Sequence, residues 1–371
     1  MPLYLTDDQA MLRDTARNFI AAEGAIAKQL RHWRDTNCSD GFGHALWKQF
    51  GEMGFTGILI DEADGGLGLG HVEAGIVLEE IGRNLTPSPF LTSAVAFVAA
   101  LKGTAPRERW YPGILAGETV AALAVDEGPK HRPEAIAMRA ERSGNGFRLT
   151  GRKQFVVHGA SADVTLVAAR TDDGLTLFAV EKGANGLEVE SVRLADSSIG
   201  ARMTFDGVEV DADAVVGEVG GGEAVLSRAL NAGRAGAAAE LVGLGSAAMD
   251  MTVDYLRQRR QFGRLIGEFQ ALQFRAAHLY SELEIARAAA LKAQQLLDEA
   301  ADEADAMVSV AKAKAGRAAT LAVQEGVQMH GGIGMTDEYD IGLYMKRDRV
   351  LNELFGDPAW HADRLARLKG Y

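Results

Sequence analysis

The residues best suited to bind a charged or planar ligand lie within residues 255–274, where Arg259 and Gln261 precede the pair Phe262-Gly263. This pair interrupts an apolar spacing that otherwise fits a helix. Because glycine tolerates positive φ, we expect one helix to end here and the chain to turn. The arginine and the glutamine would then stand at a helix end, where a cation and an amide can bind phosphate or a planar polar ring. The alternative interpretation is a helical hairpin with a solvated arginine face.

The same stretch carries aromatic, amide and glycine residues in a fixed order, namely Tyr255, Arg259, Gln261, Phe262, Gly263, Ile266, Phe269 and Gln270. They match the pattern Tyr-x-x-x-Arg-x-Gln-Phe-Gly-x-x-Ile-x-x-Phe-Gln, and residues 328–334 contain Gln-x-x-Gly-Gly-x-Gly. Further matches lie at residues 344–348 and, near the start, at residues 54–57, 65–68 and 79–83. The chain therefore resembles the acyl-CoA dehydrogenase family over nearly its whole length, in the family's order and spacing.

This resemblance implies a flavin adenine dinucleotide (FAD) held between a β domain and a helical bundle, with help from a neighbouring subunit. The cofactor-binding residues that it implies are Arg259, Gln261, Phe262, Gln328, Gly331 and Gly332, with Phe155 and Val157 in the β domain. An arginine suits the diphosphate, and glycines allow close approach of the backbone. A simple turn between helices is the alternative for Gly331-Gly332.

The implied reaction is α,β-dehydrogenation of an acyl-CoA thioester, as in fatty acid β-oxidation within lipid metabolism. A base removes the α-proton while the β-carbon passes hydride to flavin N5, and donors face the thioester oxygen. The resemblance also implies an electron-transferring flavoprotein as acceptor and a homotetramer, or a heterotetramer with a paralogue. Two alternatives stay open: an oxidase or flavin monooxygenase on the same fold, and a partner subunit without a complete site of its own.

The catalytic base is not at the position that most family members use. Many of them carry it in a Tyr-Glu-Gly-Thr segment, which here is Phe-Gly-Asp-Pro at residues 355–358, so that Gly356 replaces the glutamate. Between residues 234 and 250, Glu240 is the only charged residue among small apolar ones. A carboxylate in such surroundings is expected to be buried, which is unfavourable without a purpose. Because some family members place the base on this helix, we predict Glu240 as the base.

Several alternatives accompany this prediction. Glu240 could instead pair with an arginine or cap a neighbouring helix. The other carboxylates near the lost position are Glu353 and Asp357, which are weaker candidates. Arg234, at the start of the same helix, matches a family position beside the CoA portion of the substrate, and a buried structural ion pair is its alternative.

Two further segments depart from the family pattern. The Thr-Glu-Pro…Gly-Ser-Asp segment appears as residues 126–131, DEGPKH, and the Trp-Ile-Thr strand appears as Phe155-Val156-Val157. Val157 has no hydroxyl for flavin N5, although backbone groups at 125–128 and 155–157 could bond the ring. Phe155 could cover the face of the flavin as the usual tryptophan does.

The elements that must position these residues form three predicted domains. Residues 1–118 form an all-α domain with helices at 6–31, 45–53 and 71–82, and Thr6 is the first start signal. Residues 119–220 carry short β-rich segments separated by turns, which predicts a small antiparallel barrel or sandwich. Residues 221–371 form a four-helix bundle, with helices near 223–258, 268–299, 303–330 and 338–354. The glycine-rich residues 65–70 are predicted to be a turn. The fold class is α+β and multidomain.

Composition limits the possible partners. A net charge of −12 and a pI near 5.2 argue against nucleic acid or an anionic membrane as the main partner. The single cysteine, Cys38, excludes an internal disulfide and a thiolate metal cluster. No targeting segment or membrane span is visible, so we expect a cytoplasmic protein. His158, His278 and His330 lack ligand spacing, so they predict no metal site.

Overall fold

The computed structural model describes residues 3–371, which divide into two compact units. The first unit combines the chain up to Lys28 with His71–Thr86 and Arg234–Tyr371. The second combines Gln29–Gly70 with Pro87–Gly233. Each unit therefore assembles segments that are far apart in the sequence.

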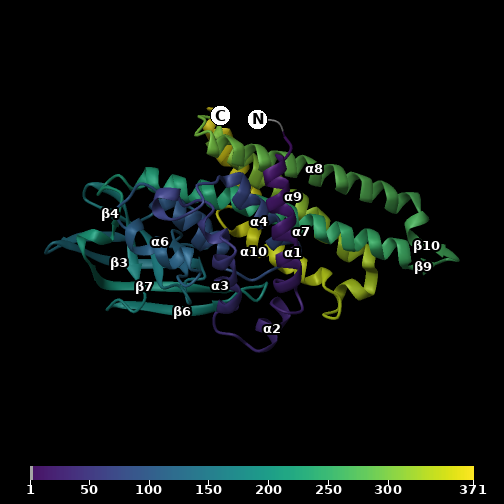
Figure 1. Ribbon diagram of the computed structural model, residues 1–371, viewed down its shortest axis with the longest axis horizontal. Coiled ribbons are helices and arrows are strands. Elements are labelled where there is room, and N and C mark those ends of the chain that lie inside the picture. Colours follow the sequence, from purple (N-terminus) through teal and green to yellow (C-terminus); the bar gives the residue numbers. More distant parts are fainter. Residues whose placement is uncertain (1–2) are drawn as a thin grey trace. The chain divides into compact units, whose positions relative to one another are not determined.

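The first unit is helical (Figure 1). Its long helices are most of α7 (Gly222–Gln258), α8 (Gln270–Asp298) and α9 (Ala304–His330), followed by α10 (Ile341–Glu353) and α11 (Pro358–Leu368). Helices α8, α10 and α11 all pack against α9. These ranges confirm the four helices predicted in the C-terminal part, and α11 is an addition to them.

The first helix is shorter than predicted. Helix α1 (Asp7–Glu23) begins where expected, because Thr6 Oγ1 accepts a hydrogen bond from Gln9 N and Gln9 Oε1 accepts one from Thr6 N. It ends at Gly24 rather than continuing to residue 31. A Cβ at Gly24 would lie 2.6 Å from the hydroxyl of Thr86, which donates to Gly24 O at 2.8 Å. This contact beyond the end of α4 (His71–Asn84) fixes where α1 stops.

Helix α7 is rich in alanine and glycine because it packs closely on α4. A Cβ at Gly243 would lie 1.9 Å from Glu79 O, and a Cβ at Gly82 would lie 2.1 Å from Glu240 O. Side chains at either glycine would push the two backbones apart. The small residues around Glu240 therefore allow helices to approach, and the middle of α7 is buried on all sides.

The second unit contains an eight-stranded sheet in the order β6-β7-β3-β2-β4-β5-β8, with β1 beside β4. The strands are β1 (Ala121–Ala124), β2 (Arg139–Ser143), β3 (Gly146–Val157), β4 (Val164–Thr171), β5 (Gly174–Glu181), β6 (Leu187–Arg193), β7 (Ile199–Val210) and β8 (Val215–Val216). Most neighbouring strands are antiparallel, and β4 runs parallel to β1 and β2. The fold class predicted from the sequence is confirmed.

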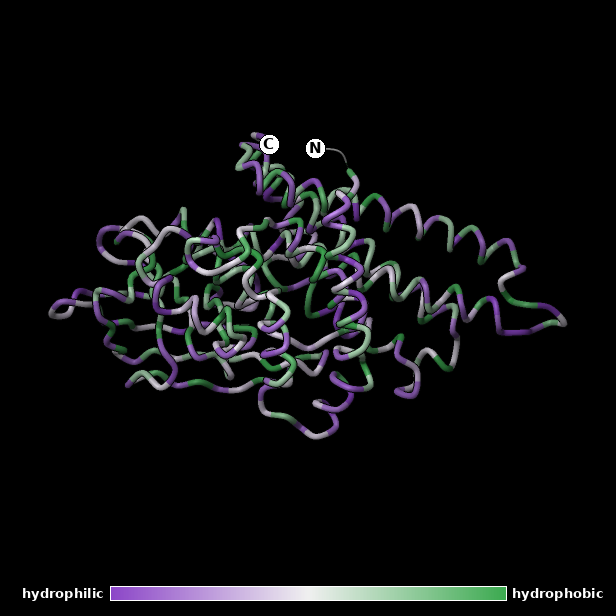
Figure 2. The backbone as a smooth tube through the Cα atoms, viewed as in Figure 1, coloured by the Kyte–Doolittle hydropathy of each residue, from purple (hydrophilic) through white to green (hydrophobic). Residues whose placement is uncertain are grey.

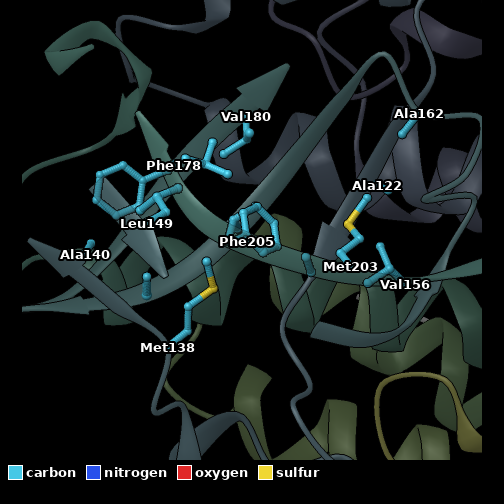
Figure 3. Close-up of a cluster of buried hydrophobic side chains, with 14 of the residues drawn as sticks. Ala122, Met138, Ala140, Leu149, Val156, Ala162, Phe178, Val180, Met203 and Phe205 are labelled. Atoms are coloured by element: carbon cyan, nitrogen blue, oxygen red, sulfur yellow. The ribbon is translucent and has the colours of Figure 1, made fainter. Parts of the chain in front are cut away.

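The core of the sheet is apolar (Figure 3). Phe147 and Phe178 meet edge to face with ring centroids 5.2 Å apart. Leu149, Phe205 and Val208, from β3 and β7, are almost completely buried beside them. Burial of such side chains stabilises the unit by about 1.5–3 kcal/mol each.

Helical segments complete the second unit. They are α2 (Leu30–Asp35), α3 (His44–Glu52), a π-helical segment (Leu91–Phe97), α5 (Val98–Leu101) and α6 (Arg107–Leu115). The glycine-rich residues 65–70 form the predicted turn, with positive φ at Gly65 and Gly68. Hydrophobic and hydrophilic residues alternate along the chain in short stretches (Figure 2). Within residues 3–371, no helix is both long enough and apolar enough to span a bilayer.

Candidate active site

Glu240, the predicted base, is buried near the middle of α7 with 2% of its surface exposed. Arg347 of α10 donates to it from Nε at 2.9 Å and from Nη2 at 2.6 Å. Both hydrogen bonds end on Oε1, and Oε2 accepts none from residues 3–371. The arginine pairing left open by the sequence is therefore present, and one carboxylate oxygen stays uncommitted.

The turn after α10 carries no carboxylate at the family's usual position. Gly356 has φ +106°, and a Cβ there would lie 2.6 Å from Trp360 Cε3. The preceding Phe355 also has positive φ, at 62°. A glutamate at position 356 would therefore be strained by its backbone and would collide with the indole.

The two weaker candidates for the base have structural roles. Asp357 caps α11 by accepting hydrogen bonds from Ala359 N at 2.9 Å and Trp360 N at 2.8 Å. Glu353 lies 3.3 Å from Arg349 one helical turn away. Neither carboxylate is presented as an unengaged base.

Arg234, predicted to bind substrate, is 2% exposed and engaged within the chain. Its Nε donates to Phe355 O at 3.2 Å, and its guanidinium lies 4.7 Å from the centre of the Trp360 ring. These contacts hold the turn after α10, so they support a structural role more directly than a contact with CoA.

Two of the predicted cofactor motifs meet at one end of the helical unit. The break at Phe262-Gly263 is confirmed as the turn between β9 (Arg260–Gln261) and β10 (Arg264–Leu265), with φ of 51° and 77°. The second motif follows the end of α9. The ring centroids of Tyr255, in the last turn of α7, and His330, at the end of α9, are 4.5 Å apart. The folded chain thus places the two motifs side by side.

These motif residues are exposed to solvent, so a ligand from outside the chain can reach them. Arg259, Gln261 and Gln328 are exposed, and Phe262 is 90% exposed. A Cβ at Gly332 would meet no atom within 4 Å, and its backbone is not left-handed. The fold of this chain does not need a glycine there, so the missing side chain leaves room for something else. The set fits the diphosphate end of a dinucleotide carried by a neighbouring subunit.

The β domain presents the other predicted cofactor residues at an irregularity in β3. The register with β7 shifts between Lys153 and Val156, and Phe155 adopts φ 52° and is half-buried. Val157 is 5% exposed and pairs with Gly200. The bulge thus turns Phe155 out of the regular strand, as a residue covering a flat ring requires.

A buried lysine of β3, Lys153, hydrogen-bonds the segment that follows β1. Lys153, which is 0% exposed, donates from Nζ to Glu127 Oε1 at 2.8 Å and to Val125 O at 3.1 Å. Glu127 also accepts from the backbone N of Ala137 and Met138. Burial lowers the pKa of Lys153, and Glu127 opposes that shift. This segment is fixed, although it lacks the family's usual side chains.

Two of the three histidines named in the sequence analysis bond groups of the chain itself. His330 Nδ1 hydrogen-bonds Gly326 O at 2.6 Å, and burial lowers the pKa of this imidazole. Its ring lies between those of Tyr255 and Tyr339. His158 lies 3.1 Å from Thr92 Oγ1 through Nδ1. Both are packing residues rather than an acid–base pair.

Sequence reasoning missed several buried ionisable groups, among them Lys153, Lys312 and Asp348. Lys312 is 0% exposed, and burial lowers its pKa to about 7. Burial likewise raises the pKa of Asp348 to about 6. The available signal was the one used for Glu240: Lys312 stands among alanines on a helix.

Comparison with known proteins agrees with this geometry. Family models match residues 6–118, 126–208 and 220–368, as the N-terminal, middle and C-terminal domains of acyl-CoA dehydrogenase. Cyclohex-1-ene-1-carbonyl-CoA dehydrogenase of Geobacter metallireducens is 31% identical, over 95% of both chains. Mitochondrial isovaleryl-CoA dehydrogenase of Pongo abelii is 30% identical, over 94% of this chain and 85% of the relative.

Solved structures show the same architecture. One chain of the ChsE4-ChsE5 complex from Mycobacterium tuberculosis superposes with a TM-score of 0.92 at 26% identity, covering all of both chains. Three domain models together span most of the sequence, and the exposed motif residues fit a dinucleotide. The chain belongs to the acyl-CoA dehydrogenase family, flavoprotein oxidoreductases whose members catalyse FAD-dependent dehydrogenation of acyl-CoA thioesters.

Proposed function

We propose that this chain dehydrogenates an acyl-CoA thioester between Cα and Cβ, with Glu240 as the base. The supporting observation is a carboxylate that is 2% exposed and keeps one oxygen uncommitted, in a chain whose usual base position is Gly356. Oε2 takes the α-proton as the Cα–Cβ double bond forms. Arg347 holds Oε1 and so fixes the orientation of the carboxylate.

The remaining predicted residues hold the cofactor. When FAD is bound, Arg259, Gln261, Phe262, Gln328, Gly331 and Gly332 of one protomer would hold the diphosphate end of its neighbour's cofactor, and Phe155 would cover the ring of its own. Backbone groups of residues 125–128 and 155–157 bond the ring edge, because Val157 has no hydroxyl to do so. When bound, FAD supplies the acceptor for the hydride that leaves Cβ.

Exchange of Glu240 for glutamine tests this assignment. Glu240→Gln should keep the flavin spectrum and lose at least 100-fold in the rate of anaerobic flavin reduction by acyl-CoA, as expected for loss of a general base. Glu80→Gln is the matched control, since Glu80 is also 2% exposed and accepts hydrogen bonds from Arg17. Reduction at the wild-type rate by Glu240→Gln would remove Glu240 from the mechanism. A panel of straight, branched and cyclic acyl-CoAs would identify the substrate.

A partner subunit is the second candidate. In its favour, Val157 and the segment at 126–131 lack the family's flavin-facing side chains, whereas the exposed motifs at the ends of α7 and α9 are complete. Such a chain would complete the FAD site of a paralogue. Protein that is colourless when purified alone, and yellow only when co-expressed with a homologue, would establish this role over the first.

Assembly and electron acceptor complete the proposal. The 90% exposed Phe262 supports burial in an oligomer, a homotetramer or a heterotetramer with a paralogue. We propose an electron-transferring flavoprotein as acceptor. Reoxidation of the reduced protein that is slow in air and fast with such a flavoprotein would agree, and fast reoxidation in air would indicate an oxidase. Mass measurement of the native assembly gives its composition.

A further inference from the structure

The buried lysine on α9 forms an unusual set of contacts. Lys312 is completely buried, and its Nζ donates to the carbonyl oxygens of Leu351, Asn352 and Gly356, each at 3.1 Å. An ammonium has three N–H donors, and all three are used on the backbone. No carboxylate lies within hydrogen-bonding distance of this Nζ among residues 3–371.

These carbonyls belong to one short piece of chain. Leu351 and Asn352 lie in the last turn of α10, where carbonyls lack partners within the helix and the helix dipole favours a cation. Gly356 lies beyond the end of the helix. The ammonium thereby ties the helix end to the turn that follows it.

A second buried cation, Arg234 on α7, contacts the same turn. Arg234 Nε donates to Phe355 O at 3.2 Å, and its guanidinium lies over the ring of Trp360. The turn contains two consecutive residues with positive φ, Phe355 and Gly356. A non-glycine residue is strained in that conformation, so surrounding contacts must hold it in place.

We infer that Lys312 is a positioning residue, which with Arg234 fixes the turn at residues 354–357 as one wall of the acyl-CoA site. The inference rests on the proposed function: Gly356 of this turn stands where many members of the family carry the base, so we take the turn to border the acyl group.

The spacing along the helices supports this role. Arg234 and Glu240 are six residues apart on α7, which corresponds to about 9 Å along the axis. Arg234 contacts the turn after α10, and Glu240 contacts Arg347 within α10. Helices α7 and α10 therefore run antiparallel, and α7 contacts α10 through Glu240 and the turn after it through Arg234. A shift of the turn would therefore act on the segment that also holds the carboxylate.

The test compares Lys312→Met with Lys314→Met. Methionine keeps most of the volume of the lysine and removes the ammonium. Lys314 also lies on α9 and pairs with Glu282 at 2.5 Å, so its exchange removes a lysine without touching the turn. Both variants are purified as full-length assemblies and studied below their melting temperatures.

Lys312→Met should lower kcat/KM at least tenfold with the FAD content unchanged, and Lys314→Met should stay within twofold of the wild type. Trp360 reports on the turn without any need for activity, because its ring packs against Gly356. Its emission, obtained as the difference from the same protein with Trp360→Phe, should shift to the red in Lys312→Met only. Unchanged Trp360 emission together with kcat/KM within twofold of wild type would overturn the inference.

Three possible outcomes leave the test able to decide. If Lys312→Met does not fold, Arg234→Lys replaces it, because lysine keeps the charge and loses the Nε donor to Phe355 O; the same readouts and limits apply. If Glu240→Gln stays active, the base assignment fails while the comparison of Lys312→Met with the wild type remains valid. If the chain alone is inactive, the Trp360 shift decides.

Discussion

Removing Arg347 from its ion pair with Glu240 should destabilise the protein much more than removing Glu240. Glu240 is 2% exposed, whereas 20% of the Arg347 side chain is exposed. Arg347→Met leaves a carboxylate buried without its partner, which costs about 3–5 kcal/mol. Glu240→Gln leaves a long cationic side chain that can move its head group towards water, and we expect a loss of about 1–2 kcal/mol.

The double variant separates the pair from its surroundings. Glu240→Gln with Arg347→Met removes both charges, so it should cost about as much as Glu240→Gln alone. The coupling energy of the resulting cycle should then equal the cost of Arg347→Met alone, about 3–5 kcal/mol in size. Urea unfolding of the wild type, the two single variants and the double variant, fitted with one shared m-value, gives these free-energy differences.

The same four proteins also test the proposed chemistry. Arg347→Met retains the carboxylate, so its folded fraction should still reduce flavin with acyl-CoA, whereas the two proteins that carry Glu240→Gln should not. The reasoning fails if Arg347→Met costs no more than Glu240→Gln, because the carboxylate would then not be the more deeply buried charge. It also fails if the four free energies are additive.

Four other substitutions should change stability or FAD binding in a known direction. Gly356→Glu should destabilise the protein by about 2 kcal/mol or more without restoring activity to Glu240→Gln, because of its φ of +106° and the contact with Trp360; unfolding and flavin reduction measure both. Gly332→Ala should leave the melting temperature within about 1 °C and weaken FAD binding in a fluorescence titration, whereas Gly243→Ala should destabilise strongly, because its Cβ would overlap Glu79 O. Lys312 has a pKa of about 7 in the folded protein against 10.5 for an ordinary lysine. Its unfolded form binds the extra proton between these values, so the stability of wild type relative to Lys312→Met should rise with pH from about 7 to 10.5, by up to about 1.4 kcal/mol per unit. Asp348, Arg234, Asp357 and Glu353 also act on this group, and a flat difference would contradict the shift.

Sequence patterns predicted those elements whose boundaries are set locally. Thr6 caps α1, and Phe262-Gly263 forms the turn between β9 and β10 that follows α7, because each signal acts through the residues next to it. The prediction for α1 passed over a local signal, because glycine commonly ends a helix and α1 ends at Gly24. Thr86, 62 residues away, adds a hydrogen bond from its hydroxyl to Gly24 O that local sequence does not reveal.

In the candidate site, too, some features follow from the local sequence and others depend on distant residues. Glu240 was identifiable because one charge among alanines and glycines must be buried. Its partner was not, because Arg347 is one of many arginines and is 107 residues away. Lys312 was missed for a related reason, because its partners are backbone carbonyls, which every residue has, and the partners of Lys153 are one carbonyl and one of many carboxylates. Local sequence can therefore indicate a buried charge, but the fold decides what neutralises it.

The buried charges on α7 and α9 act on one element, helix α10. Glu240 holds it near the middle through Arg347, and Lys312 holds its last turn. A buried ion pair is often no more stabilising than apolar residues of similar volume, so stability alone does not account for placing Glu240 and Arg347 there. Glu240→Gln removes the charge from the contact with Arg347, so it should also loosen α10 at that point. If Glu240 serves both purposes, Glu240→Gln should lose α-proton removal and also show faster amide hydrogen exchange in α10, whereas Glu80→Gln should show neither effect. Faster exchange without loss of reduction would mean that Glu240 holds the helix only.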